Sequence, residues 1–126
     1  MASVLLLEDE RALRALLREA LEDAGHDVVD APDGRAARDP ELVAATDVMV
    51  TDLMMPLCDG LEAIRSARAI KASVGIVAMS GGGRRVTTDF LPLARELGAD
   101  SVLYKPFLTS EMIEAVARAA GKAGGS

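Results

Sequence analysis

Residues 48–56 read Val48-Met49-Val50-Thr51-Asp52-Leu53-Met54-Met55-Pro56, and this segment is the most informative one for the fold. Its first four residues are typical of a buried strand, and an aspartate follows them directly. A carboxylate at the tip of a buried strand contributes little to a core. Two other strand-like runs end in charge: Val4–Leu7 precedes Glu8-Asp9, and Ser101–Tyr104 precedes Lys105. Charged side chains at strand ends are therefore the functional signal of this chain.

Five apolar, strand-like runs alternate with helical patterns, which predicts right-handed βαβ units and a parallel sheet. The predicted strands are Val4–Leu7, Asp27–Ala31, Val48–Thr51, Gly75–Met79 and Ser101–Tyr104. We expect an α/β, flavodoxin-like, doubly wound (βα)5 fold with a five-stranded parallel sheet in the order 2-1-3-4-5. The second helical segment contains a proline, so we expect a late start or a kink near Asp39-Pro40.

Length and composition indicate one soluble domain. The 126 residues are enough for a single core, and we assign 1–120 to the domain and 121–126 to a flexible tail. The net charge of -6 argues against nucleic acid as a partner. The chain shows neither a signal peptide nor an apolar run long enough to span a bilayer, so we expect a cytoplasmic protein without membrane contact. Cys58, the single cysteine, is expected to be a buried, inert thiol.

The strand-end residues suit phosphoryl chemistry. In a doubly wound sheet, ligands bind beyond the carboxyl ends of the strands where the order reverses, here between strands one and three. Glu8, Asp9 and Asp52 would meet there, and three carboxylates repel unless a cation neutralises them. Mg²⁺ suits such a site. Asp52 would be the nucleophile and Lys105 would stabilise phosphoryl charge, with the Ser80 hydroxyl at the same edge.

Each of these residues alone has an ordinary explanation. A strand-end aspartate is often a turn former or a helix cap, and Glu8 and Asp9 would also suit the start of the first helix. Ser80 precedes a glycine run, and Lys105 precedes a proline, so both would suit solvated loops. Their joint occurrence at the ends of four predicted strands favours one shared site.

These motifs resemble the receiver domain of two-component response regulators over essentially the whole chain. The matching segments are Leu6–Glu10, Asp33-Gly34, Thr51–Pro56, Asp59-Gly60, Met79–Gly81, Gly98–Asp100 and Lys105–Phe107. The resemblance implies that a phosphohistidine, on a sensor histidine kinase or a histidine phosphotransfer protein, passes its phosphoryl group to Asp52. It also implies an Mg²⁺ site in which Asp9 binds directly, Glu8 binds through water, and the backbone carbonyl of Met54 adds a ligand.

The resemblance further implies how phosphorylation is sensed. Ser80, Gly81 and Lys105 would contact the phosphoryl group, and movement of Ser80 would reposition the face formed by the fourth helix, fifth strand and fifth helix. The family has a switch aromatic three residues before the lysine, where this chain has Val102. Tyr104 lies on the same face of the strand and partly substitutes in this reading. The segment 81–85, GGGRR, would give a flexible loop near the site.

We interpret the chain as a stand-alone receiver that switches contacts with an unidentified target protein. Two alternatives stay open, namely a phosphorelay intermediate and a receiver cut from a longer regulator. We expect a phosphoacceptor switch rather than an enzyme, and Mg²⁺-dependent autodephosphorylation is the one turnover compatible with this expectation. A haloacid-dehalogenase-type phosphatase needs a second aspartate two residues after the nucleophile, and that position is Met54. A nucleotide- or flavin-binding module would require a glycine-rich phosphate-binding motif, which this sequence lacks.

Overall fold

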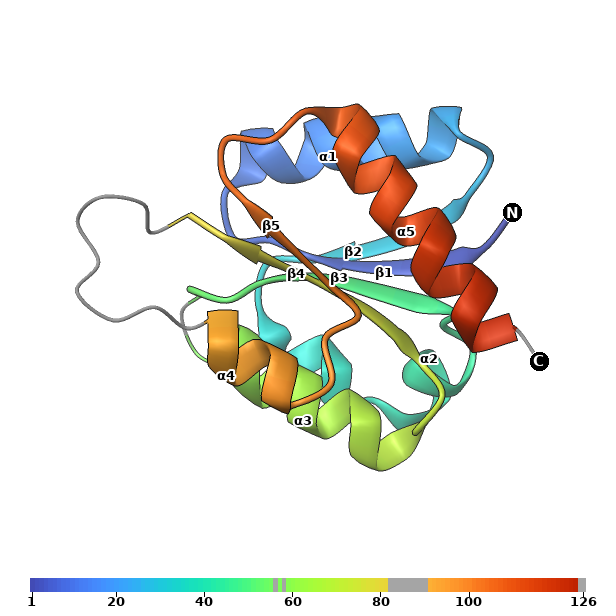
Figure 1. Cartoon of the computed structure of the whole chain (residues 1–126), viewed down its shortest axis with the longest axis vertical. Coiled ribbons are helices and arrows are strands. Elements are labelled where there is room, and N and C mark those ends of the chain that lie inside the picture. Colours follow the sequence, from blue (N-terminus) through green and yellow to red (C-terminus); the bar gives the residue numbers. More distant parts are fainter. Residues whose placement is uncertain (56, 58, 82–90, 125–126) are drawn as a thin grey trace.

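The computed structural model describes residues 1–55, 57, 59–81 and 91–124, and its centre is one parallel sheet (Figure 1). The strands are β1 (Ser3–Leu7), β2 (Asp27–Ala31), β3 (Val48–Asp52), β4 (Gly75–Ser80) and β5 (Ser101–Tyr104). Their order is β2-β1-β3-β4-β5, which confirms the predicted topology. All five residues of β3 are buried because the strand lies mid-sheet between two layers of helices.

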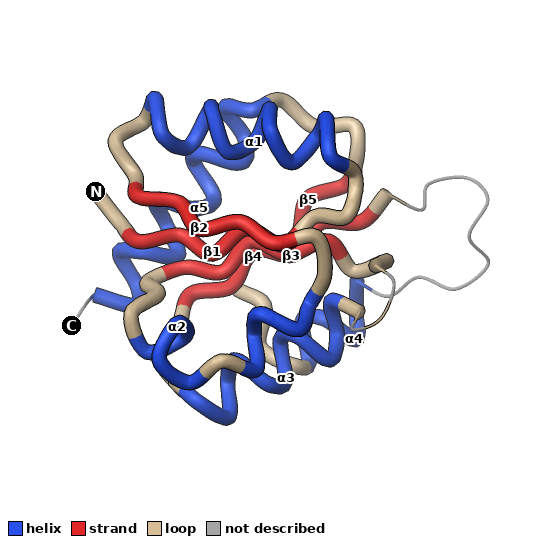
Figure 2. The backbone as a smooth tube through the Cα atoms, turned by 180° about the vertical axis from the view of Figure 1, so that it is seen from behind, coloured by secondary structure: helices blue, strands red, loops and turns tan. Residues whose placement is uncertain are grey.

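Helices cover both faces of the sheet (Figures 1 and 2). They are α1 (Arg11–Asp23), the 3-10 helix η1 (Gly34–Arg38), α2 (Pro40–Ala44), α3 (Gly60–Ile70), α4 (Leu91–Glu96) and α5 (Thr109–Gly124). Leu17 and Leu21 of α1 share one core with α5, whereas Ile64 of α3 belongs to the core of the opposite face. Successive residues of β1 alternate between the two cores, which explains why its whole run is apolar.

The second helical segment breaks where the proline predicted it. η1 ends at Arg38, and α2 starts with Pro40 in its first turn, where the missing N–H costs nothing. The Asp39 side chain caps α2 by accepting hydrogen bonds from the amides of Glu41 (3.1 Å) and Leu42 (3.3 Å). The proline therefore divides the segment into two short helices.

The C-terminal helix is longer than expected. We assigned 121–126 to a flexible tail, but α5 continues to Gly124. The alanine-rich composition of its last turns favours helix, which offsets the cost of Gly121. Residues 125–126, Cys58 and the loop 82–85 lie outside the described residues. In the part of the chain that is described, the helices fall short of the length and hydropathy needed to cross a bilayer.

Candidate functional site

The carboxyl ends of β1, β3 and β5 bring the predicted residues together. Glu8 and Asp9 follow β1, Asp52 ends β3, and Lys105 follows β5. Carboxylate oxygens of Glu8, Asp9 and Asp52 lie within 4.8 Å of one another. This proximity follows from the pairing of β1 with β3, which sets Leu7 beside Thr51 and so aligns the residues after them.

Asp52 is buried and held through both carboxylate oxygens. Its Oδ2 lies 2.5 Å from Lys105 Nζ, and its Oδ1 accepts a hydrogen bond of 2.9 Å from the backbone amide of Met54. Only 4% of the residue is exposed. The carboxylate is therefore oriented by an ammonium on one side and by the turn after β3 on the other, and two charge-assisted bonds offset its burial.

Glu8 shares the same ammonium. Its Oε1 lies 2.8 Å from Lys105 Nζ, and its Oε2 accepts a 3.0 Å hydrogen bond from the amide of Glu10. Burial raises the pKa of Glu8 from 4.5 to about 7; the bond to Lys105 opposes this shift, whereas the nearby charge of Asp52 reinforces it. Burial acts to lower the pKa of Lys105, but its bonds to Asp52 and Glu8 outweigh burial and raise that pKa.

The donor set fits Mg²⁺. This ion prefers hard oxygen ligands and is usually held by one or two carboxylates together with water. Glu8 and Asp52 are buried, whereas Asp9 is exposed at the rim and leaves room for water and phosphate oxygens. The Met54 amide points its hydrogen at Asp52; the role predicted for the Met54 carbonyl as a metal ligand stays a prediction.

The predicted phosphoryl and switch residues lie on β4 and β5 next to this cluster. Ser80 ends β4, and its carbonyl accepts a 2.8 Å hydrogen bond from the amide of Lys105. Gly81 lies against the Lys105 side chain, since a Cβ there would be 3.3 Å from Lys105 Cδ. Val102 packs against the core of the α3 face, whereas Tyr104, paired in register with Ser80, is 60% exposed. Their roles in switching stay predictions.

Two contacts that support the site were not assigned from the sequence. A Cβ at Gly60, the first residue of α3, would lie 2.2 Å from the carbonyl oxygen of Asp52, so only glycine lets α3 begin against this strand end. Arg14 of α1 donates from Nη1 to the carbonyl of Glu8 at 2.9 Å. The signal for Arg14 was its spacing of three and seven residues from the buried Leu17 and Leu21, which places a charge on the inner face of α1.

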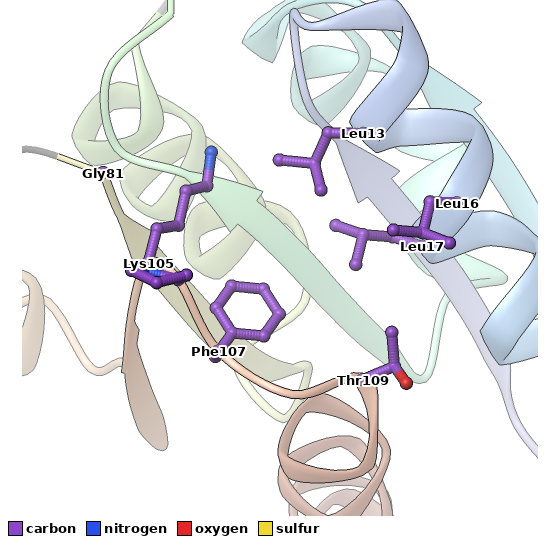
Figure 3. A pocket seen from close by; sticks show the side chains of 8 residues that line it. Leu13, Leu16, Leu17, Gly81, Lys105, Phe107 and Thr109 are labelled. Carbon is purple, nitrogen blue, oxygen red and sulfur yellow. The ribbon is translucent and has the colours of Figure 1, made fainter.

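An apolar cavity of about 350 Å³ adjoins the site (Figure 3). Leu13, Leu16 and Leu17 of α1 line one side of the cavity, and Phe107 and the stem of Lys105 line the other. Leu16 is 55% exposed, so the cavity opens onto an apolar stretch of surface. The approach to the ammonium of Lys105 is thus apolar on the α1 side.

Known proteins are similar to this chain in sequence and in fold. Residues 4–117 match the family model of the response regulator receiver domain. Response regulator MprA of Mycolicibacterium vanbaalenii is 34% identical over 110 residues, which cover 87% of this chain and 46% of MprA. The chain thus spans about half the length of MprA. Protein CcdB of Bacillus subtilis is 33% identical over 124 residues, covering 96% of this chain and 99% of that protein. A receiver domain structure from Clostridium thermocellum superimposes with a TM-score of 0.86 at 25% identity, over 97% of this chain and 96% of that one.

Proposed function

Because this chain belongs to the response regulator receiver family, we propose that it is a phosphorylation-controlled switch whose phosphoacceptor is Asp52. The donor is a phosphohistidine on a sensor histidine kinase or a histidine phosphotransfer protein. The observation that carries the proposal is the buried Asp52 carboxylate, bonded to Lys105 and clustered with Glu8 and Asp9 at the carboxyl edge of the sheet.

In the transfer step, a carboxylate oxygen of Asp52 forms a bond to phosphorus while the phosphorus–nitrogen bond of the donor breaks. The imidazole leaves with the electron pair and takes a proton from solvent. Bound Mg²⁺ supplies charge neutralisation for the phosphoryl oxygens. Glu8, Asp9 and Asp52, with the Met54 carbonyl, are the residues that would hold it. The Met54 amide keeps the nucleophile oriented during the step.

Lys105 supplies the second positive charge of the site. Before phosphorylation its ammonium pairs with both Glu8 and Asp52, and afterwards it pairs with the phosphoryl oxygens. Ser80 donates its hydroxyl to the same group, and Gly81 contacts it through the backbone. The proximity of Gly81 to the Lys105 stem supports this grouping.

The output is a change in protein contacts at the face formed by α4, β5 and α5. Val102 occupies the position of the usual aromatic and is half-buried, so we assign the aromatic contact to Tyr104, which is exposed and adjoins Ser80 in the sheet. Movement of Ser80 toward the phosphoryl group then acts on Tyr104 through the β4–β5 pairing.

We also propose a cytoplasmic receiver that works without nucleic acid or catalytic turnover of substrates. The match to CcdB, which covers 99% of that protein, supports the stand-alone receiver. The match to MprA, which covers 46% of that protein, supports the alternative of a receiver within a longer regulator. The Met54 side chain, two residues after the nucleophile, cannot serve as a general acid. Incubation with a generic phosphomonoester should therefore release no phosphate beyond a buffer control.

Intact-protein mass spectrometry after treatment with acetyl phosphate tests the acceptor. We expect the wild type to gain the mass of one phosphoryl group only when Mg²⁺ is present. Asp52→Asn should gain none while giving the same circular dichroism spectrum. Because Asp59 is an exposed aspartate that caps α3, Asp59→Asn is the matched control and should still be labelled. Full labelling of Asp52→Asn would refute the assignment.

A further inference from the structure

Arg14 holds the peptide group that joins two of the predicted metal ligands. Its Nη1 donates to the carbonyl oxygen of Glu8 at 2.9 Å, and that carbonyl belongs to the Glu8–Asp9 peptide. On the other side of Glu8, its amide donates to the carbonyl of Ala31, at the end of β2, at 3.1 Å. The backbone that carries both carboxylates is thus tied to α1 and to β2, and not to its own strand alone.

Arg14 is itself held in place from β2. Its Nε lies 3.9 Å from Asp30 Oδ2, and its side chain is 19% exposed. Arg18, one turn later on α1, also pairs with Asp30, at 3.4 Å from Nη1, and with Glu22 at 3.2 Å from Nε. The two arginines therefore share a helix and a partner, and Arg14 adds the bond to the Glu8 carbonyl.

We propose that Arg14 is a positioning residue for metal binding, because it fixes the plane of the Glu8–Asp9 peptide and so the direction in which the two carboxylates leave the backbone. The inference rests on the proposed function, since it assumes Mg²⁺ at these carboxylates. Groups that orient metal ligands from outside the ligand set commonly matter almost as much as the ligands. The guanidinium charge by itself repels a cation, so its benefit to binding is geometric.

The charge of Arg14 and its positioning role affect Mg²⁺ affinity in opposite directions, which makes the proposal testable. If Arg14 acted only through its charge, its removal would strengthen Mg²⁺ binding. If it acted only as a tie between α1 and β2, removal would lower stability and leave the affinity as it was. Positioning predicts the third result, weaker binding of Mg²⁺ despite the loss of a nearby positive charge.

The experiment is calorimetric titration of MgCl₂ into wild type, Arg14→Met, Arg14→Gln, Arg14→Lys and, as the matched control, Arg18→Met. We expect the Kd for Mg²⁺ to rise about tenfold in Arg14→Met and Arg14→Gln, as is typical when an orienting partner is removed. Arg14→Lys keeps a charged donor on a long side chain and should recover part of the loss. Arg18→Met should keep the wild-type Kd. Thermal unfolding in EDTA shows how much stability each variant loses, and if Arg14→Met does not fold, Arg14→Gln carries the test.

An NMR measurement adds a readout that needs no metal. The carbonyl carbon of Glu8 should shift upfield in Arg14→Met and Arg14→Gln, because its charge-assisted hydrogen bond is lost, and should be unchanged in Arg18→Met. An unchanged or lower Kd in both neutral variants, or an equal rise in Arg18→Met, would overturn the inference while leaving the receiver function in place. A wild type that binds no Mg²⁺ would overturn both.

Discussion

Replacing Glu8 with glutamine should remove a pH-dependent loss in the free energy of unfolding of the metal-free protein. The Glu8 carboxyl is 1% exposed, and its pKa is raised from 4.5 to about 7, mainly by burial. The folded protein therefore keeps a proton on Glu8 up to a higher pH than the unfolded chain does. It follows that the free energy of unfolding falls as the pH rises from 4.5 to about 7 and is constant above that range, as far as this group is concerned.

The size of the effect follows from the same pKa values. The interval from 4.5 to about 7 is about 2.5 pH units, and one unit corresponds to about 1.4 kcal/mol, so ionised Glu8 costs about 3 to 4 kcal/mol. Glutamine cannot ionise, and its single side-chain oxygen can accept only one of the two hydrogen bonds that Glu8 accepts, from Lys105 or from the Glu10 amide, so the loss of the other bond reduces the gain. At pH 8 in EDTA, Glu8→Gln should therefore be more stable than wild type by about 3 to 4 kcal/mol less the cost of that lost bond, and this advantage should be nearly absent at pH 5.

Urea unfolding followed by circular dichroism between about pH 5 and pH 8 measures this difference. Circular dichroism replaces intrinsic fluorescence because the chain has no tryptophan. The control is Glu10→Gln, at an exposed position, which should follow the wild-type profile. Equal slopes of stability against pH for wild type and Glu8→Gln across this range would contradict the prediction, because the burial of Glu8 would then carry no cost.

Three further predictions concern the same site and its core. Lys105→Met removes the ammonium that Glu8 and Asp52 share, so the free energy of unfolding in EDTA at pH 8 should fall by about 3 kcal/mol. Urea unfolding in saturating Mg²⁺ should show this stability restored, and a variant equally stable with and without Mg²⁺ would contradict the prediction. Gly60→Ala puts a Cβ 2.2 Å from the Asp52 carbonyl oxygen, so it should lower the free energy of unfolding by about 2 to 3 kcal/mol and slow labelling by acetyl phosphate. Labelling of the variant at the wild-type rate would show that α3 can shift away from Asp52 without affecting the acceptor. Leu21→Ala empties part of the core between α1 and α5 and should cost about 2 to 5 kcal/mol in urea, with the Mg²⁺ affinity unchanged.

Much of the fold was predictable because local signals agree with it. The apolar runs of the five strands, and the proline at position 40, are properties of neighbouring residues, and the structure confirms the strands and the helix break. The ends of elements were less predictable. β3 extends one residue further, through Asp52, because Leu53 next to it still bonds to the carbonyl of Met79 on β4 at 2.9 Å. We assigned 121–126 to a tail, whereas α5 continues to Gly124; composition alone did not predict where this helix ends.

Which charged groups meet could be read from the order of residues along the chain, because parallel strands end at one edge and Glu8, Asp9, Asp52 and Lys105 each follow or end a strand. How these groups contact one another depends on the packing of the folded chain. A single ammonium bridges two buried carboxylates, and Arg14 holds the peptide between two of the three acidic residues. These contacts depend on how α1 packs against β1 and β2 and on how β4 joins β5 to β3. Residues 97 and 53 positions apart along the chain come within hydrogen-bond distance only after that packing is complete, so no local pattern encodes their geometry.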